Sequence, residues 1–130
     1  MHFLHRPFFV HELHRAPGNQ GSVGAVIQAY LKRSEGDIEK LLTESIRIRL
    51  CKGAYKEPAS IAFEKKEEVD ANYVKLMKIL LKSGVYHGLA THDASMIRQA
   101  QAFATSEKIA RDSFEFQMLY GIRRDRKSVV

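Results

Sequence analysis

The sequence is poor in features that would place it outside the cytoplasm. Its 130 residues include one cysteine, Cys51, so no disulfide can form within the chain, which fits a reducing compartment. No apolar run approaches the roughly 20 residues that a membrane-spanning helix needs. The first residues show no signal-peptide pattern, because His and Pro interrupt their apolar positions. We therefore expect a cytoplasmic protein without an integral membrane segment, either free or peripheral to a membrane.

The sequence also lacks a nucleic-acid-binding face. The net charge of +6 favours an anionic partner, such as a nucleotide cofactor or a nucleic acid. However, no basic stripe interleaves with aromatic residues, so we expect no nucleic-acid partner and interpret most lysines and arginines as solvated surface. Internal repeats and low-complexity tracts are absent too. At 130 residues, the chain is long enough for one modest domain.

Strand and helix patterns alternate from residue 22 onward. The near-continuous apolar run at 23–27 is typical of a parallel strand that is covered on both faces. Further strands are expected at 46–51, 86–91 and 114–120, with amphipathic helices between them that Ser34, Asp70 and Asp93 would cap. This order predicts an α/β fold with a parallel sheet and right-handed crossovers. A complete eight-stranded barrel needs about 250 residues, so the sheet is either small and open or part of a barrel.

Residues 1–20 differ in character from the rest. Four of the six histidines lie there, at His2, His5, His11 and His14. Two H-x2-H spacings can place imidazoles on one helix face, but Pro7 interrupts the helix, so we predict no metal site. The predicted organisation is a His-rich segment at 1–20, a partial-barrel domain at 21–124 and a tail at 125–130.

Polar residues gather where the predicted strands end. The candidates at or near these ends are Gln28, Arg49, Lys52, Thr91, His92 and Leu119. The carboxyl ends of parallel strands share one edge, and α/β proteins bind ligands there. Because polar side chains on apolar strands need partners, a ligand is one explanation. A pairing of Arg47 or Arg49 with Glu115 on the inner face is the alternative.

Three features near these strand ends have two interpretations each. Lys52 and Gly53 can present an ammonium and backbone N–H groups to a phosphate or a flavin edge, or form a glycine turn with an exposed lysine. Neither dinucleotide-fold nor phosphate-loop glycine spacing is present. His92 either donates to an anionic or carbonyl oxygen or is merely exposed beside the cap Asp93. Cys51, next to Arg49 and Lys52, either has a lowered thiol pKa or packs in the core.

Four segments, at 26–30, 49–58, 90–93 and 114–121, resemble the proline dehydrogenase family in order and spacing, particularly its monofunctional bacterial members. The resemblance implies a (β/α)8 TIM barrel with non-covalent FAD, of which this chain would hold about four parallel βα units, similar to barrel strands 4 to 7. It implies oxidation of L-proline to 1-pyrroline-5-carboxylate by hydride transfer to the flavin, with a quinone as the final electron acceptor.

The resemblance also implies roles for single residues. Arg49 corresponds to a catalytic arginine beside the flavin N5, where a cation stabilises developing negative charge. The residues that correspond to FAD contacts are Gln28, Lys52, Gly53, Ala54, Thr91 and His92. Tyr55 and Leu119 correspond to residues near the substrate pocket.

The chain departs from the family pattern at both ends. The first barrel strands, with a lysine and an aspartate of the active site, are absent from it, as are the last strand and the helix that carries paired arginines. We therefore expect the 130-residue chain to be inactive alone, and its open sheet edges favour self-association. The alternative is a non-enzymatic subunit or pseudo-enzyme that pairs with another chain.

Overall fold

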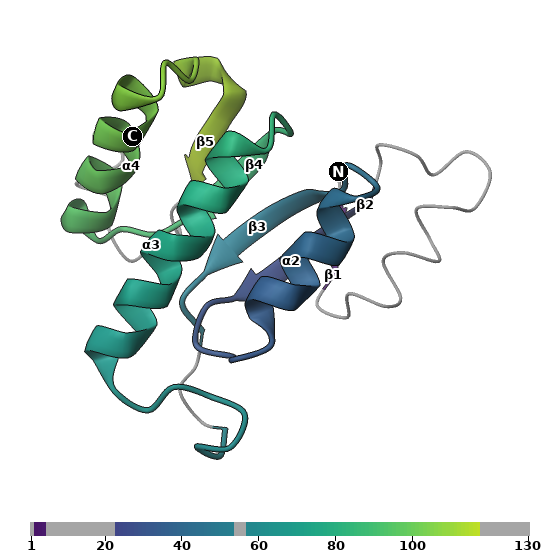
Figure 1. Cartoon of the computed structure of the whole chain (residues 1–130), viewed down its shortest axis with the longest axis vertical. Coiled ribbons are helices and arrows are strands. Elements are labelled where there is room, and N and C mark those ends of the chain that lie inside the picture. The colour runs from purple at the N-terminus through teal and green to yellow at the C-terminus, as the bar shows by residue number, and fades with distance from the viewer. Residues whose placement is uncertain (1, 5–22, 54–56, 118–130) are drawn as a thin grey trace.

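A computed structural model describes residues 2–4, 23–53 and 57–117, which form one parallel sheet (Figure 1). The strands are β1 (His2–Leu4), β2 (Val23–Gln28), β3 (Arg47–Cys51), β4 (His87–Ala90) and β5 (Phe114–Gln117). They lie side by side in chain order, and every neighbouring pair is parallel. The expected partial α/β barrel is confirmed. The sequence did not reveal β1, because three residues in a His-rich segment carry no strand pattern.

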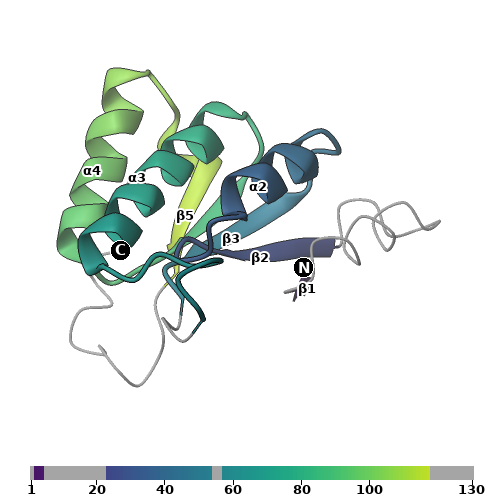
Figure 2. The ribbon, with the colours of Figure 1, turned by 60° about the horizontal axis from the view of Figure 1, so that its bottom comes forward.

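Three helices connect the later strands and lie on one side of the sheet (Figure 2). They are α2 (Ser34–Leu42), α3 (Lys66–Lys82) and α4 (Ala94–Ser106), and a short 3-10 turn, η1 (Arg111–Ser113), precedes β5. Their apolar faces and the facing strand residues form one buried cluster, which includes Ile48, Leu50, Tyr73, Leu76, Leu80 and Leu89. None of the helices in the described ranges is long and apolar enough to cross a membrane.

The opposite side of the sheet is polar, and we call it the open face. Ile48 and Leu50 on β3 are fully buried beneath the helices, so the residues that alternate with them point the other way. Arg47 is exposed there, while Arg49 and Cys51 are half-buried. No helix of the described residues covers this side (Figure 2). It corresponds to the face that a closed barrel would enclose.

The helix starts agree only in part with the predicted caps. Asp93 caps α4 as expected, with its side chain accepting a hydrogen bond from the backbone. In contrast, α2 begins after Arg33, and the Ser34 hydroxyl donates to a strand carbonyl instead of capping. The helix α3 begins at Lys66, so Asp70 lies inside its second turn.

A buried histidine joins two strands and a helix end. The Nδ1 of His87 accepts a hydrogen bond from the Ile48 backbone N–H at 3.0 Å, and its Nε2 lies 3.0 Å from the Ser83 hydroxyl. An imidazole that accepts at Nδ1 is neutral. Burial, aided by the positive charge of Arg47, lowers the pKa of His87 to about 4.

We predict that acid destabilises the fold through His87. Because the folded pKa of about 4 lies below the ordinary 6.5, the unfolded chain binds a proton first as the pH falls. The contribution of His87 to the free energy of unfolding is therefore fully present above pH 6.5. It decreases towards pH 4, by up to about 3 kcal/mol. Urea unfolding of wild type and His87→Gln at pH 7.5 and 5 checks this. An equal loss of stability in both proteins would contradict it.

Candidate functional site

The ends of β2, β3 and β4 meet at the carboxyl edge of the sheet. Register pairs Gln28 with Cys51, and pairing continues beyond the strands because the Tyr30 N–H donates to the Lys52 carbonyl at 2.8 Å. The end of β4 leads directly into Thr91. The structure thus brings Gln28, Arg49, Lys52, Gly53, Thr91 and His92 to this edge or to the adjoining open face. Ala54, Tyr55 and Leu119 lie outside the described residues.

On the open face Arg49 has an unforeseen partner. Its Nε donates to Oε1 of Gln117 at 2.7 Å, across β4, which lies between their strands. The alternative interpretation, a pairing of Arg47 or Arg49 with Glu115, is not what the structure shows. Arg47 lies over the Tyr86 ring at 5.4 Å, and Glu115 is beside the Tyr86 hydroxyl. Burial and then the Glu115 charge raise the pKa of Tyr86.

Lys52 is held between two carboxylates. Its Nζ lies 2.8 Å from Asp70 Oδ1 and 3.1 Å from Asp93 Oδ2, and Lys66 contacts the other Asp70 oxygen at 2.9 Å. The Asp70 Oδ1 atom is buried, and the Lys52 ammonium is its ion-pair partner. Since the Lys52 side chain is only 20% exposed, the second of its two interpretations, an exposed lysine, is wrong. It ties the turn after β3 to α3 and α4.

The carboxylates of this group are ionised. Although burial works against ionisation, the ammonium groups of Lys52 and Lys66 lower the pKa of Asp70. Burial also opposes ionisation of Asp93, but Lys52 and the backbone at the start of α4 lower its pKa. Two cations and two anions therefore cancel, and little net positive charge remains at Lys52 for an anionic ligand.

Gly53 occupies a position that only glycine suits. Its φ of +109° is in a region that residues with a side chain rarely adopt. A Cβ there would also collide with the Tyr30 ring, which packs against this backbone. Tyr30 itself is buried with Ala62 and Val69. The turn after β3 is thus fixed on two sides, by the Tyr30 ring and by the Lys52 ion pairs.

The turn after β4 leaves a histidine at the edge of the sheet. The hydroxyl of Thr91, a buried residue, accepts a hydrogen bond from the Asp93 N–H at 3.1 Å. His92 is half-buried, and its ring makes no hydrogen bond within the described ranges. The donation of a hydrogen bond from His92 to a ligand oxygen therefore stays a prediction.

Cys51 does not have the lowered thiol pKa that its basic neighbours suggested. Burial raises the pKa of the thiol, although the positive charge of Arg49 acts in the opposite direction. The Sγ lies 3.7 Å from the Ile27 carbonyl oxygen. Cys51 is thus a half-buried packing residue that feels the charge of Arg49.

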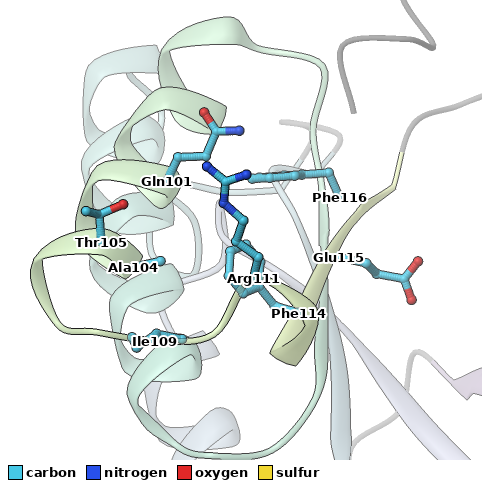
Figure 3. Close-up of a pocket in the computed structure, with 8 residues that line it drawn as sticks. All are labelled: Gln101, Ala104, Thr105, Ile109, Arg111, Phe114, Glu115 and Phe116. Carbon is cyan, nitrogen blue, oxygen red and sulfur yellow. The ribbon is translucent and has the colours of Figure 1, made fainter.

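A hollow of about 420 Å³ lies beside α4 and β5, away from these residues (Figure 3). The lining residues are Gln101, Ala104, Thr105, Ile109, Arg111, Phe114, Glu115 and Phe116. The Glu115 carboxylate points away from the other lining side chains. Among the described residues, no group of three His, Cys, Asp or Glu side chains is placed to hold a metal ion.

Comparison with known proteins decides the family. The sequence model described as proline dehydrogenase matches residues 8–128. The chain belongs to the proline dehydrogenase family. It is 50% identical over 103 residues to a proline dehydrogenase of Deinococcus radiodurans, and 48% identical over 101 residues to proline dehydrogenase 2 of Bacillus subtilis. These alignments cover 79% and 78% of the chain but 33% of each relative, so the chain spans a third of their length.

Solved structures agree with the fold. Proline utilization A from Bdellovibrio bacteriovorus, crystallised after inactivation by N-propargylglycine, superposes with a TM-score of 0.77 at 31% identity. The match covers 85% of this chain and 14% of that protein. A mutant of proline utilization A from Bradyrhizobium japonicum gives a TM-score of 0.80 at 26% identity, over 91% of this chain and 14% of its own. The sheet and helices thus correspond to a part of a much longer family member.

We predict that Gly53→Ala lowers stability more than Gly84→Ala does. Both glycines have positive φ, but only at Gly53 would the new Cβ meet a neighbouring side chain, the Tyr30 ring. Strain alone costs on the order of 1 kcal/mol, and the collision adds to it at Gly53. Urea denaturation of the two variants measures the difference. Equal losses would show that Tyr30 does not constrain the turn.

We also predict that Lys52→Met destabilises the fold by about 1–3 kcal/mol, because it leaves two half-buried carboxylates without their shared cation. Lys75→Met is the matched control. Lys75 pairs with Glu35 at 2.6 Å, but its side chain is 58% exposed, so its loss should change stability by at most about 0.5 kcal/mol. Thermal unfolding at low and high salt checks both, and similar effects would refute a special role for Lys52.

Proposed function

We propose that this chain carries the flavin-facing part of an FAD-dependent proline dehydrogenase, which oxidises L-proline to 1-pyrroline-5-carboxylate and passes electrons to a quinone. Family membership supports the reaction class. The observation that carries the proposal is the position of Arg49. It is a half-buried cation on the open face, near the carboxyl end of a parallel strand. Active sites of α/β barrels lie at that end.

The donors on this face fit a flavin ring. Arg49 supplies a guanidinium, and Gln28 supplies a half-buried amide. Such groups donate to the carbonyl oxygens and ring nitrogens of a flavin edge. His92 and the hydroxyl of Thr91 lie at the neighbouring strand end. We assign Gln28, Gly53, Thr91 and His92 to cofactor binding on this basis, with Arg49 as the catalytic cation.

Lys52 fits this group differently from what the sequence suggested. Its ammonium is already engaged by Asp70 and Asp93, so it has little charge to offer a phosphate. We propose that Lys52 holds the turn so that backbone N–H groups at Gly53 and Ala54 can face the cofactor. Tyr55 and Leu119 keep the substrate-pocket roles that the resemblance implies.

A bound FAD would supply the oxidising power by accepting a hydride from C5 of proline while the ring nitrogen loses a proton, giving 1-pyrroline-5-carboxylate. Arg49 would stabilise the negative charge that accumulates on the cofactor side during this transfer. An electrostatic contribution of this kind is typically worth 100- to 1,000-fold in kcat. The open face provides the cation without a carboxylate in ion-pair contact among the described residues.

The isolated 130-residue chain should show no turnover. Within the described residues the sheet has two edges, β1 and β5, and its open face carries no cover. A substrate on such a face would stay in contact with water, whereas hydride transfer benefits from a closed site. The same open edges favour the second candidate, a non-enzymatic subunit that pairs with a second copy or with another chain.

We predict that a chimera tests the first proposal directly. Residues 23–117 of this chain would replace the matching third of the Deinococcus radiodurans enzyme, which is 50% identical. The purified chimera should keep a flavin absorbance spectrum after desalting, and L-proline should bleach it. Arg49→Met should then lower kcat by about 100-fold or more, because the developing charge loses its cation.

The matched control is Arg47→Met on the same strand and face. Arg47 lies over the Tyr86 ring and is further from the carboxyl edge, so kcat should stay within about two-fold of the parent chimera, as for surface changes elsewhere. A folded chimera that retains no FAD would contradict the proposal. Proline-dependent bleaching by the isolated chain would overturn the expectation that it is inactive alone.

A further inference from the structure

The link between Arg49 and Gln117 crosses an entire strand. The two residues are 68 positions apart, on β3 and β5, and β4 lies between them. Register places Arg49 beside Gly88, and Gly88 beside Glu115, with Gln117 two residues further along β5. The hydrogen bond therefore runs diagonally over β4, on the open face. A 2.7 Å bond from a charged donor is among the stronger kinds in proteins.

This crossing depends on the small residues of β4. A Cβ built on Gly88 would lie 2.5 Å from Nε2 and 2.8 Å from Cδ of Gln117, closer than such carbon atoms are found. The next residue of β4 on the same face is Ala90, with the smallest side chain after glycine. Because β4 carries only small residues on the open face, the Gln117 side chain can lie across it.

The Gln117 side chain carries no charge, so it does not neutralise Arg49. A carboxylate would cancel the charge of the guanidinium, whereas an amide oxygen fixes its Nε and leaves the charge intact. Glu115, on the same strand and face, is not the group that binds Arg49. With Nε fixed, the plane of the guanidinium is set, and its two terminal nitrogens remain as donors.

We propose that Gln117 is a positioning residue for Arg49, and that Gly88 keeps the path between them clear. This inference rests on the proposed function, in which Arg49 stabilises charge on a bound flavin. Gln117 would act through Arg49, by holding its guanidinium in the orientation in which the terminal nitrogens face the ligand.

The first test uses the chain as it is, without cofactor. In ¹⁵N NMR spectra the Arg49 Nε–Hε group should give a resolved signal that exchanges slowly with water, assigned by its loss in Arg49→Lys. Gln117→Met keeps the length of the side chain but removes the acceptor, and Gly88→Ala blocks the path. Both should lose the protected signal, while Glu115→Gln, the neighbouring control, should keep it. A protected signal in Gln117→Met would overturn the proposal, even if Gly88→Ala fails to fold.

The second test uses Cys51, the only cysteine of the chain, as a probe of charge on this face. Arg49 acts to lower the pKa of this thiol, so the pH midpoint of Cys51 alkylation reports where the guanidinium lies. The midpoint should rise in Arg49→Met and rise by a smaller amount in Gln117→Met, because the unanchored guanidinium turns towards water. A wild-type midpoint in Gln117→Met would show that Gln117 does not hold the charge.

The third test separates positioning from structure in the FAD-retaining chimera. Gln117→Met should lower kcat by about 10- to 100-fold with little change in KM, as misplacement of a catalytic group does. Gln117→Glu restores an acceptor but adds a negative charge, so it should not restore kcat. A chimera without flavin refutes the proposed function, but the two cofactor-free measurements still decide the role of Gln117. Unchanged kcat in Gln117→Met refutes that role alone.

Discussion

The two-residue period of a β-strand is the constraint on which this structure depends. Because Ile48 and Leu50 must be buried beneath the helices, Arg47, Arg49 and Cys51 can only point to the other side. Burying apolar side chains of this size is worth roughly 1.5–3 kcal/mol each, far more than an exposed ion pair. A shift of register by one residue would bury both arginines and expose the core. Burial of the apolar side of the sheet therefore determines which polar side chains lie on the open face.

The carboxyl edge is held by electrostatics, since loops cannot be fixed by strand pairing alone. Lys52 reaches Asp70 on α3 and Asp93 at the start of α4. The backbone turn that follows is fixed by Gly53 and the buried ring of Tyr30. The turn after β3, the helix α3 and the start of α4 are thus joined by one small charged group, although they are distant in sequence. Its two cations and two anions cancel, so the group orders the edge without adding to its positive potential.

Sequence patterns predicted the parallel α/β sheet because alternation and helical spacing are local properties. The apolar run predicted at 23–27 lies within β2, Val23–Gln28. Asp93 was recognised as a cap because its position before an apolar periodic segment is a local signal. The partners of Arg49 and Lys52 could not be found in this way, since they come from residues 68 and 18 to 41 positions away. Asp70 was mistaken for a cap because its type fits one, but Lys52 and Lys66 engage it in the folded chain. His87 gave no sequence signal at all, because its role follows from burial beside Ile48 and Ser83.

The two cations near the end of β3 have different roles, one in holding the structure and one in the proposed chemistry. Lys52 follows the strand, so its flexible side chain can turn back to α3 and α4, where carboxylates neutralise it. Arg49 lies within the strand and must stay on the open face, where a neutral amide holds it and Gly88 leaves room for that contact. An ammonium is a compact point charge suited to a cluster of carboxylates, whereas a guanidinium has several donors and can be fixed by one while others bind elsewhere. The positive charge that this part of the chain keeps available is therefore the one in the strand and not the one in the loop.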